Sequence, residues 1–253
     1  MPAEDADLFF QPQQTAYDLN FSLFGFPVRV NPFFWLIGAF LGWSYVQLGF
    51  EYLAIFIGCF FVSILVHELG HAVMFRAFGT HSSIWLYGFG GLAIPNGTVY
   101  GKMRRIIVSL AGPFAGFILL GLLILTERAF HWTEGNVYLV MTFSTLYFMN
   151  LFYGLFNLIP IYPLDGGQVA REIFTGVTPR KGIELSLMLS ILLAGVLAVH
   201  GLMSANGRPL LTFLPFGGYF MAIMFGMLAF ENYQMLQAHR HRSGWNDGPS
   251  WGR

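Results

Sequence analysis

Residues 52–78 form an apolar run long enough to cross a lipid bilayer, and the sequence HELGH lies inside it at positions 67–71. A helix of about 20 residues spans the roughly 30 Å hydrocarbon core of a membrane. Ionisable side chains are costly to keep in that core, so three of them within one span indicate a functional site. The run therefore predicts a membrane helix that carries chemistry.

Six apolar segments of this kind predict an all-α polytopic membrane protein. Only 10% of the 253 residues are charged and the mean hydropathy is +0.59, whereas water-soluble domains carry roughly 25% charged residues. Backbone groups must be hydrogen-bonded internally within hydrocarbon, and no alternating barrel pattern is present, so we expect helices. The six predicted spans are residues 32–50, 52–78, 106–126, 137–159, 185–203 and 211–233.

The lysine and arginine residues predict the orientation. With six spans, both termini and the loops after the second and fourth spans share one side of the membrane. That side holds eleven of the 13 basic residues, and the other side holds only Arg128 and Arg208. The positive-inside rule then predicts an integral protein with both termini in the cytoplasm, in a bacterial cytoplasmic membrane. We expect residues 1–24 to be loosely ordered, 25–236 to form the membrane core and 237–253 to form a basic cytoplasmic tail.

The HELGH sequence has the spacing of a metal site. Imidazoles four positions apart on a helix lie on one face, with β-carbons about 5–6 Å apart, so His67 and His71 can share one metal ion. A glutamate between them, here Glu68, is the usual general base of a zinc hydrolase. At 1.5 Å per residue, His67 lies roughly 23 Å from the outer face, a depth that the fourth span reaches near residues 154–157. These features predict hydrolytic chemistry within the membrane.

Asp165 is the best candidate for a third metal ligand, because catalytic zinc generally takes three protein ligands. Two prolines, Pro160 and Pro163, end the preceding helix and leave irregular backbone at membrane depth, which is tolerated where it is buried or lines a wet cavity. Gly166 and Gly167 permit a tight turn that could direct the carboxylate at the histidines. The alternative is that Asp165 belongs to an ordinary surface turn.

The chain resembles the site-2 protease family of intramembrane metalloproteases. Four motifs carry the resemblance: HELGH at 67–71, FGG at 89–91, AGP at 111–113, and NLIP at 157–160 leading to PLDGG at 163–167. It implies one Zn²⁺ per chain, held by His67, His71 and Asp165, with Glu68 as the base. It also implies that Asn157 holds the substrate backbone or helps to stabilise the oxyanion; the alternative for Asn157 is a helix-packing hydrogen bond. Neither a PDZ domain nor a CBS pair fits between or after the spans, so we expect a minimal membrane core.

Residues 83–101 are too short and too rich in glycine for another span. Their apolar residues predict a short re-entrant β-hairpin or sheet between the second and third helices, with Asn96-Gly97 as the turn. We expect its edge to capture unwound substrate as an added strand. The edge residues expected to bind substrate are Gly90, Gly91 and Leu92. The alternative is a loop that lies on the bilayer surface.

The sequence as a whole predicts a zinc-dependent intramembrane endopeptidase that acts on transmembrane proteins within the lipid bilayer, with no nucleic-acid partner. One alternative is a catalytically silent binder or chaperone of the same fold, which would not need Glu68. Another is a metal transporter, but spans one, three and six offer almost no polar residues for a path to the outer face. The sequence identifies no partner that gates substrate entry.

Overall fold

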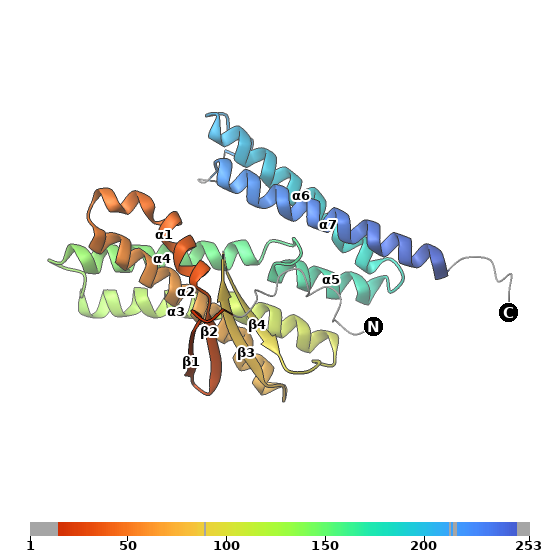
Figure 1. Ribbon diagram of the computed structural model, residues 1–253, viewed down its shortest axis with the longest axis horizontal. Coiled ribbons are helices and arrows are strands. Elements are labelled where there is room, and N and C mark those ends of the chain that lie inside the picture. Colours follow the sequence, from red (N-terminus) through yellow and green to blue (C-terminus); the bar gives the residue numbers. More distant parts are fainter. Residues whose placement is uncertain (1–14, 89, 213, 215–216, 247–253) are drawn as a thin grey trace. The chain divides into compact units, whose positions relative to one another are not determined.

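The computed structural model describes residues 15–88, 90–212, 214 and 217–246. It divides into two compact units, Met1–Leu155 and Phe156–Arg253, and both are mainly helical (Figure 1). Residues 1–14 of the predicted loosely ordered segment and 247–253 of the predicted basic tail lie outside the described residues. Leu19–Leu23, which we expected within the loosely ordered segment, form a strand.

The first unit holds a four-stranded sheet and most of the long helices. Its elements in chain order are β1 (Leu19–Leu23), β2 (Phe26–Val30), α1 (Pro32–Leu41), the 3-10 helix η3 (Trp43–Gln47), α2 (Phe50–Ala77), β3 (Ser82–Tyr87), β4 (Gly90–Pro95), α3 (Lys102–Phe130) and α4 (Val137–Asn157), whose last residues belong to the second unit. The second unit continues with α5 (Asp165–Val177), α6 (Gly182–Ala205) and α7 (Tyr219–Asn246). Within the described part of the chain, four helices are long and apolar enough to cross a membrane, namely α2, α3, α4 and α6.

The sheet has the order β1-β2-β3-β4, with β2 and β3 parallel and the other pairs antiparallel. The hairpin predicted between the second and third long helices is present as β3 and β4, but it belongs to a larger sheet than expected, because two further strands precede α1. The predicted turn at Asn96-Gly97 was wrong. The chain reverses after Gly88, whose φ of +44° suits glycine, and Asn96 follows β4.

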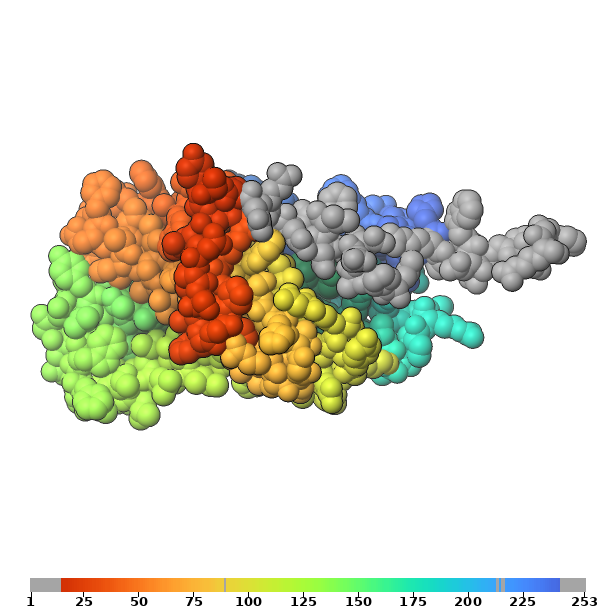
Figure 2. Space-filling view, turned by 60° about the horizontal axis from the view of Figure 1, so that its bottom comes forward, coloured from red at the N-terminus to blue at the C-terminus, as the bar shows by residue number. Residues whose placement is uncertain are grey.

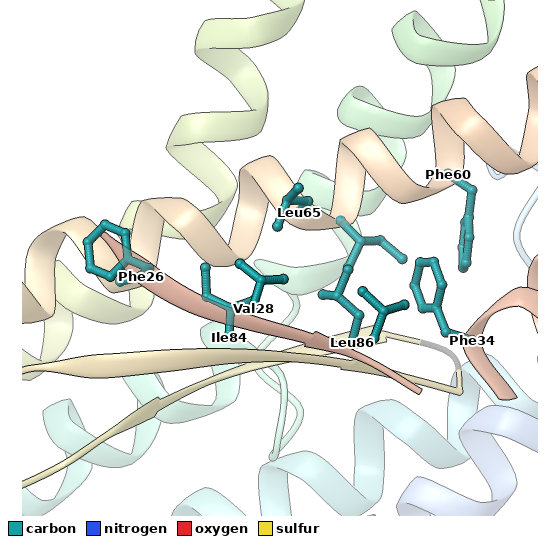
Figure 3. Packing of buried hydrophobic residues seen from close by; sticks show 10 residues of the cluster. Phe26, Val28, Phe34, Phe60, Leu65, Ile84 and Leu86 are labelled. Atoms are coloured by element: carbon teal, nitrogen blue, oxygen red, sulfur yellow. The ribbon is translucent and has the colours of Figure 1, made fainter. Parts of the chain in front are cut away.

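The sheet packs against the C-terminal half of α2 (Figure 3). Side chains from β2 and β3 point at the helix and meet Ile64, Leu65 and Ala72 from it, and all of them are buried. The strand residues in this core are Phe26, Val28, Val30, Ile84 and Leu86. Alternation along each strand supplies this apolar face, since every second residue points to the same side of a sheet.

The N-terminal half of α2 is covered by α1. The rings of Phe34 and Phe60 stack with centroids 4.9 Å apart, and a β-carbon built on Gly42 would lie 2.4 Å from Phe56 Cδ1. Successive contacts therefore pair later residues of α1 with earlier residues of α2, so the two helices run antiparallel. The sheet packs along the other half of α2. Helix α1, which has 10 residues, therefore covers only the N-terminal half.

The prediction of six spanning helices is confirmed only in part. Residues 32–50 were expected to form one helix, but α1 ends before Gly42 and the chain continues as η3. The last expected span begins only at Tyr219 and runs on into a polar second half, and it is not among the four apolar helices. Helix α5 was not predicted, because its sequence is short and carries no continuous apolar run.

A buried ion pair joins Asp18, which precedes β1, to Arg29 of β2. Asp18 accepts hydrogen bonds from Thr15 and Arg29, and the Arg29 guanidinium lies 4.5 Å from the centroid of the Trp85 ring on β3. Burial by itself raises the pKa of Asp18, but the hydrogen bonds from Thr15 and Arg29 hold it below its ordinary value. The segment that contains β1 is drawn in red in Figure 2, where it forms part of the protein surface.

Candidate metal centre

Helix α2 brings three ionisable side chains to one buried position. His67, Glu68 and His71 are each less than a tenth exposed. The two imidazole rings lie with their centroids 4.9 Å apart and their planes at 75°, and a ring nitrogen of one lies within 4.8 Å of a ring nitrogen of the other. The spacing of four residues produces this pairing, as the sequence predicts.

A glycine of α3 gives the two histidines the space in which they converge. A β-carbon built on Gly112 would lie 2.2 Å from Nε2 of His71 and 2.7 Å from Nε2 of His67. Both Nε2 atoms therefore face the same point beside α3. The helices also approach closely at the preceding residues, since a β-carbon on Gly70 would lie 2.3 Å from the carbonyl oxygen of Ala111. This role of Gly112 was not predicted from the sequence.

A backbone carbonyl fixes the proton of His71. Nδ1 of His71 lies 2.7 Å from the carbonyl oxygen of Val108. A carbonyl can only accept, so Nδ1 carries the hydrogen and the lone pair of the neutral ring is on Nε2. Metal-binding histidines commonly donate their other ring nitrogen in this way. The paired Nε2 atoms therefore fit a divalent metal ion with imidazole ligands, such as zinc.

The carboxylate of Glu68 lies beside the strand β4. A β-carbon built on Gly91 would lie 2.4 Å from Cγ of Glu68 and 2.8 Å from its Oε1. Only glycine leaves room for the carboxylate at this distance from the strand. Gly90, Gly91 and Leu92, which we expected at a substrate-binding edge, belong to β4, the last strand in the order of the described sheet.

Asp165 and Asn157 belong to the second unit. Asp165 is the first residue of α5 and is buried, whereas Asn157 is half-buried at the last residue of α4. A β-carbon on Gly166 would lie 2.2 Å from the carbonyl oxygen of Leu158, so this position has no room for a larger side chain. Gly166 and Gly167 are the second and third residues of α5, so the expected tight turn at these positions is not present. The roles of Asp165 and Asn157 stay predictions.

Two polar side chains hold the backbone that precedes Asp165. Ser190 of α6 accepts a hydrogen bond from the amide of Tyr162 at 2.9 Å, and Asn232 of α7 donates to the carbonyl of Tyr162 at 2.6 Å. Ser190 and Asn232 are buried. The interior of the second unit therefore fixes the loop that leads into α5 and Asp165.

Comparison with known proteins finds similarity to one peptidase family. A model of peptidase family M50 matches residues 128–199. A zinc metalloprotease of Methanocaldococcus jannaschii is 30% identical over 189 residues, which are 74% of this chain and 54% of that protein. The chain is therefore similar to members of peptidase family M50. A Synechocystis relative is 33% identical over 226 residues, which are 83% of this chain and 57% of that protein.

Two further similarities extend this result. Stage IV sporulation protein FB of Bacillus subtilis is 30% identical over 167 residues, which are 65% of this chain and 54% of that protein. The solved structure of a site-2 protease from Methanocaldococcus jannaschii aligns with a TM-score of 0.61 at 24% identity, covering 87% of this chain and 95% of that one. The fold is therefore similar to that of this site-2 protease structure. The chain spans a little over half the length of the curated relatives that it matches.

Proposed function

We propose that the chain is a zinc-dependent endopeptidase that hydrolyses peptide bonds in or near the transmembrane segments of other membrane proteins. The observation that carries the proposal is the arrangement on α2, where two imidazole Nε2 atoms converge beside Gly112 while Glu68 lies against Gly91 of β4. The similarity to family M50 and the names of the relatives support the same reaction.

One zinc ion per chain would be held by His67, His71 and Asp165. The two histidines offer the nitrogen ligands that zinc prefers, and Asp165 offers a buried carboxylate fixed at the start of α5. Three protein ligands leave a position for water, as catalytic zinc sites do. Bound zinc would supply Lewis-acid chemistry toward water and the peptide carbonyl.

The proton transfers would belong to Glu68. Its carboxylate takes a proton from the attacking water and delivers it to the nitrogen of the leaving amine, the two roles of a general base and acid in peptide hydrolysis. The Asn157 side chain would donate through its amide nitrogen to the substrate backbone or to the oxygen that gains negative charge. Burial of Glu68 limits the access of bulk solvent to these steps.

Substrate would bind as an extended strand along β4. Peptide bonds in a helix are hydrogen-bonded internally and shielded, so the substrate must unwind before cleavage. Added to β4, its backbone would be hydrogen-bonded beside the Glu68 carboxylate, with Gly90, Gly91 and Leu92 at the contact. Single-span membrane proteins are the expected substrates, and a partner that gates entry stays unidentified.

The chain would cross the membrane six times, with both termini in the cytoplasm of a bacterial cell. β2 lies beside β3, and β3 follows the C-terminal end of α2. Helix α2 begins at its other end, with Phe50. Between β2 and Phe50 the chain must therefore run the length of α2, through α1 and η3. Helix α7 would return the chain to the side of the membrane on which its N-terminus lies. Basic residues support this orientation, since Arg76 lies in the last turn of α2, Lys102 begins α3 and Lys181 precedes α6.

The decisive experiment compares wild-type protein with Glu68→Gln. Purified protein in lipid vesicles is incubated with a single-span membrane protein, and both cleavage and bound zinc are measured. Loss of the base should lower the rate by about 10²–10⁴-fold while zinc stays bound. Glu51→Gln, in the exposed first turn of the same helix, is the matched control and should cleave like wild type.

Two other outcomes would reject the proposal. A zinc-loaded wild-type protein that binds membrane proteins without cleaving them would identify a silent binder or chaperone. Zinc uptake into sealed vesicles that is unaffected by Glu68→Gln would identify a metal transporter.

A further inference from the structure

A tyrosine of α4 contacts the side of His67. The ring of Tyr153 meets the imidazole edge-on, with centroids 4.8 Å apart and planes at 71°. Aromatic rings prefer this geometry to a face-to-face sandwich, so the contact favours one orientation of the imidazole. Tyr153 therefore limits the tilt of His67.

The hydroxyl of the same tyrosine lies beside β4. A β-carbon built on Gly90 would lie 3.3 Å from Oη of Tyr153, and a β-carbon built on the next residue, Gly91, would collide with Glu68. Successive residues of a strand face opposite sides. The start of β4 therefore passes between the Tyr153 hydroxyl on one side and the Glu68 carboxylate on the other.

The position of β4 in the sheet makes this contact important for binding. Gly90 and Gly91 pair with Tyr87 and Leu86 of β3, and β4 is the last strand in the order of the described sheet. An added peptide would pair with the outer edge of β4, and the register of that pairing decides which of its bonds lies beside Glu68. A displacement of β4 along its own axis would move the cleavage position.

We propose that Tyr153 is a positioning residue that sets the register of the bound substrate. Its ring orients His67, and its hydroxyl holds the Gly90–Gly91 segment against Glu68. A phenol hydroxyl can donate or accept a hydrogen bond without carrying charge, which suits a group within a membrane protein. This inference rests on the proposed function and adds to it the group that selects the scissile bond.

The test is Tyr153→Phe, which keeps the ring on His67 and removes the hydroxyl. Zinc content should equal that of wild type. The ratio kcat/KM should fall roughly tenfold, mainly through KM, as expected for the loss of one hydrogen bond. Mass spectrometry should detect a second product cut two residues from the main site, because a shift of two residues keeps the same strand face. Tyr147→Phe, a half-buried tyrosine of α4 that contacts Phe143 and Phe148, should give the single wild-type product.

Two results would overturn the inference. The first is cleavage by Tyr153→Phe at the wild-type bond alone with unchanged KM, and the second is loss of zinc from this variant. Hydrogen exchange at the amides of Gly90 and Gly91 provides a measurement that does not need catalysis. It should be about tenfold faster in Tyr153→Phe than in Tyr147→Phe, and equal exchange would also reject the role. A zinc-loaded wild type that fails to cleave would reject the proposed function, while the exchange comparison still decides whether the hydroxyl holds β4.

Discussion

Helices α2 and α6 are both apolar enough to cross a membrane, and both carry buried histidines that use Nδ1 in opposite ways. In α2, Nδ1 of His71 donates to the carbonyl of Val108 at 2.7 Å. In α6, Nδ1 of His200 accepts from the amide of Leu211 at 3.0 Å. The neutral ring of His71 therefore has its lone pair on Nε2, whereas that of His200 has its hydrogen there. Burial and residue type are the same, and the partner of Nδ1 decides which histidine can bind a metal.

Glu68 of α2 and Ser190 of α6 provide a second contrast between the two helices. Glu68 and the two imidazoles of α2 lie beside glycines that leave them space, Gly91 and Gly112. Ser190 of α6 instead accepts a hydrogen bond from a loop backbone, at the amide of Tyr162. A polar residue within an apolar helix therefore indicates chemistry only where the neighbouring element leaves room for a ligand.

Exchanging each histidine for alanine tests the comparison most strongly. His71→Ala removes a ligand and should lower zinc affinity by more than about a hundredfold and abolish cleavage, because loss even of a supporting group around a metal costs 10- to 100-fold. His200→Ala should retain one zinc per chain. Zinc is measured by atomic emission on purified protein. Loss of zinc from His200→Ala together with its retention in His71→Ala would reverse the assignment.

A methyl group at Gly112 should produce the next largest effect. The added carbon of Gly112→Ala would occupy the point faced by both Nε2 atoms, so zinc affinity should fall roughly 10- to 100-fold while the helices still form. Gly121→Ala on the same helix is the control, because nothing lies within 4 Å of its β-carbon. Competition with a fluorescent chelator measures both affinities. Equal affinities would mean that the imidazoles bind metal elsewhere.

The smallest expected change comes from Ser190→Ala in α6. It leaves the buried amide of Tyr162 without this acceptor, so the free energy of unfolding should fall by about 1–3 kcal/mol. Zinc stoichiometry should stay at one per chain. Unfolding in detergent, followed by circular dichroism, gives the first quantity. An unchanged unfolding curve would show that the hydrogen bond contributes nothing to the second unit.

Local spacing made part of the fold and site predictable. The pairing of His67 and His71 needs only the period of one helix, and the apolar runs of α2, α3, α4 and α6 are long enough to be recognised alone. The sheet was predicted incompletely, because β2 pairs with β3 across more than 50 intervening residues. Nothing local in the sequence encodes that pairing.

The clearance at Gly112 and the contact of Tyr153 could not be predicted for a similar reason. Each depends on which face one helix turns toward another, and glycines and tyrosines are common in membrane helices for packing alone. The position of Tyr153, one turn before Asn157 on α4, was the only local signal. The ligand role of Asp165 stays a prediction from the order of the motifs.

The pairing of β2 with β3 also determines how the protein would respond to bilayers of different thickness. A continuous helix adapts to a thicker or thinner membrane by tilting as a rod. Strands that are hydrogen-bonded to their neighbours through the backbone cannot tilt independently of one another. The adjustment to membrane thickness would occur in α1 and η3. Residues 67–71 would keep a constant depth relative to the membrane surface nearest the C-terminal end of α2, whatever the lipid composition.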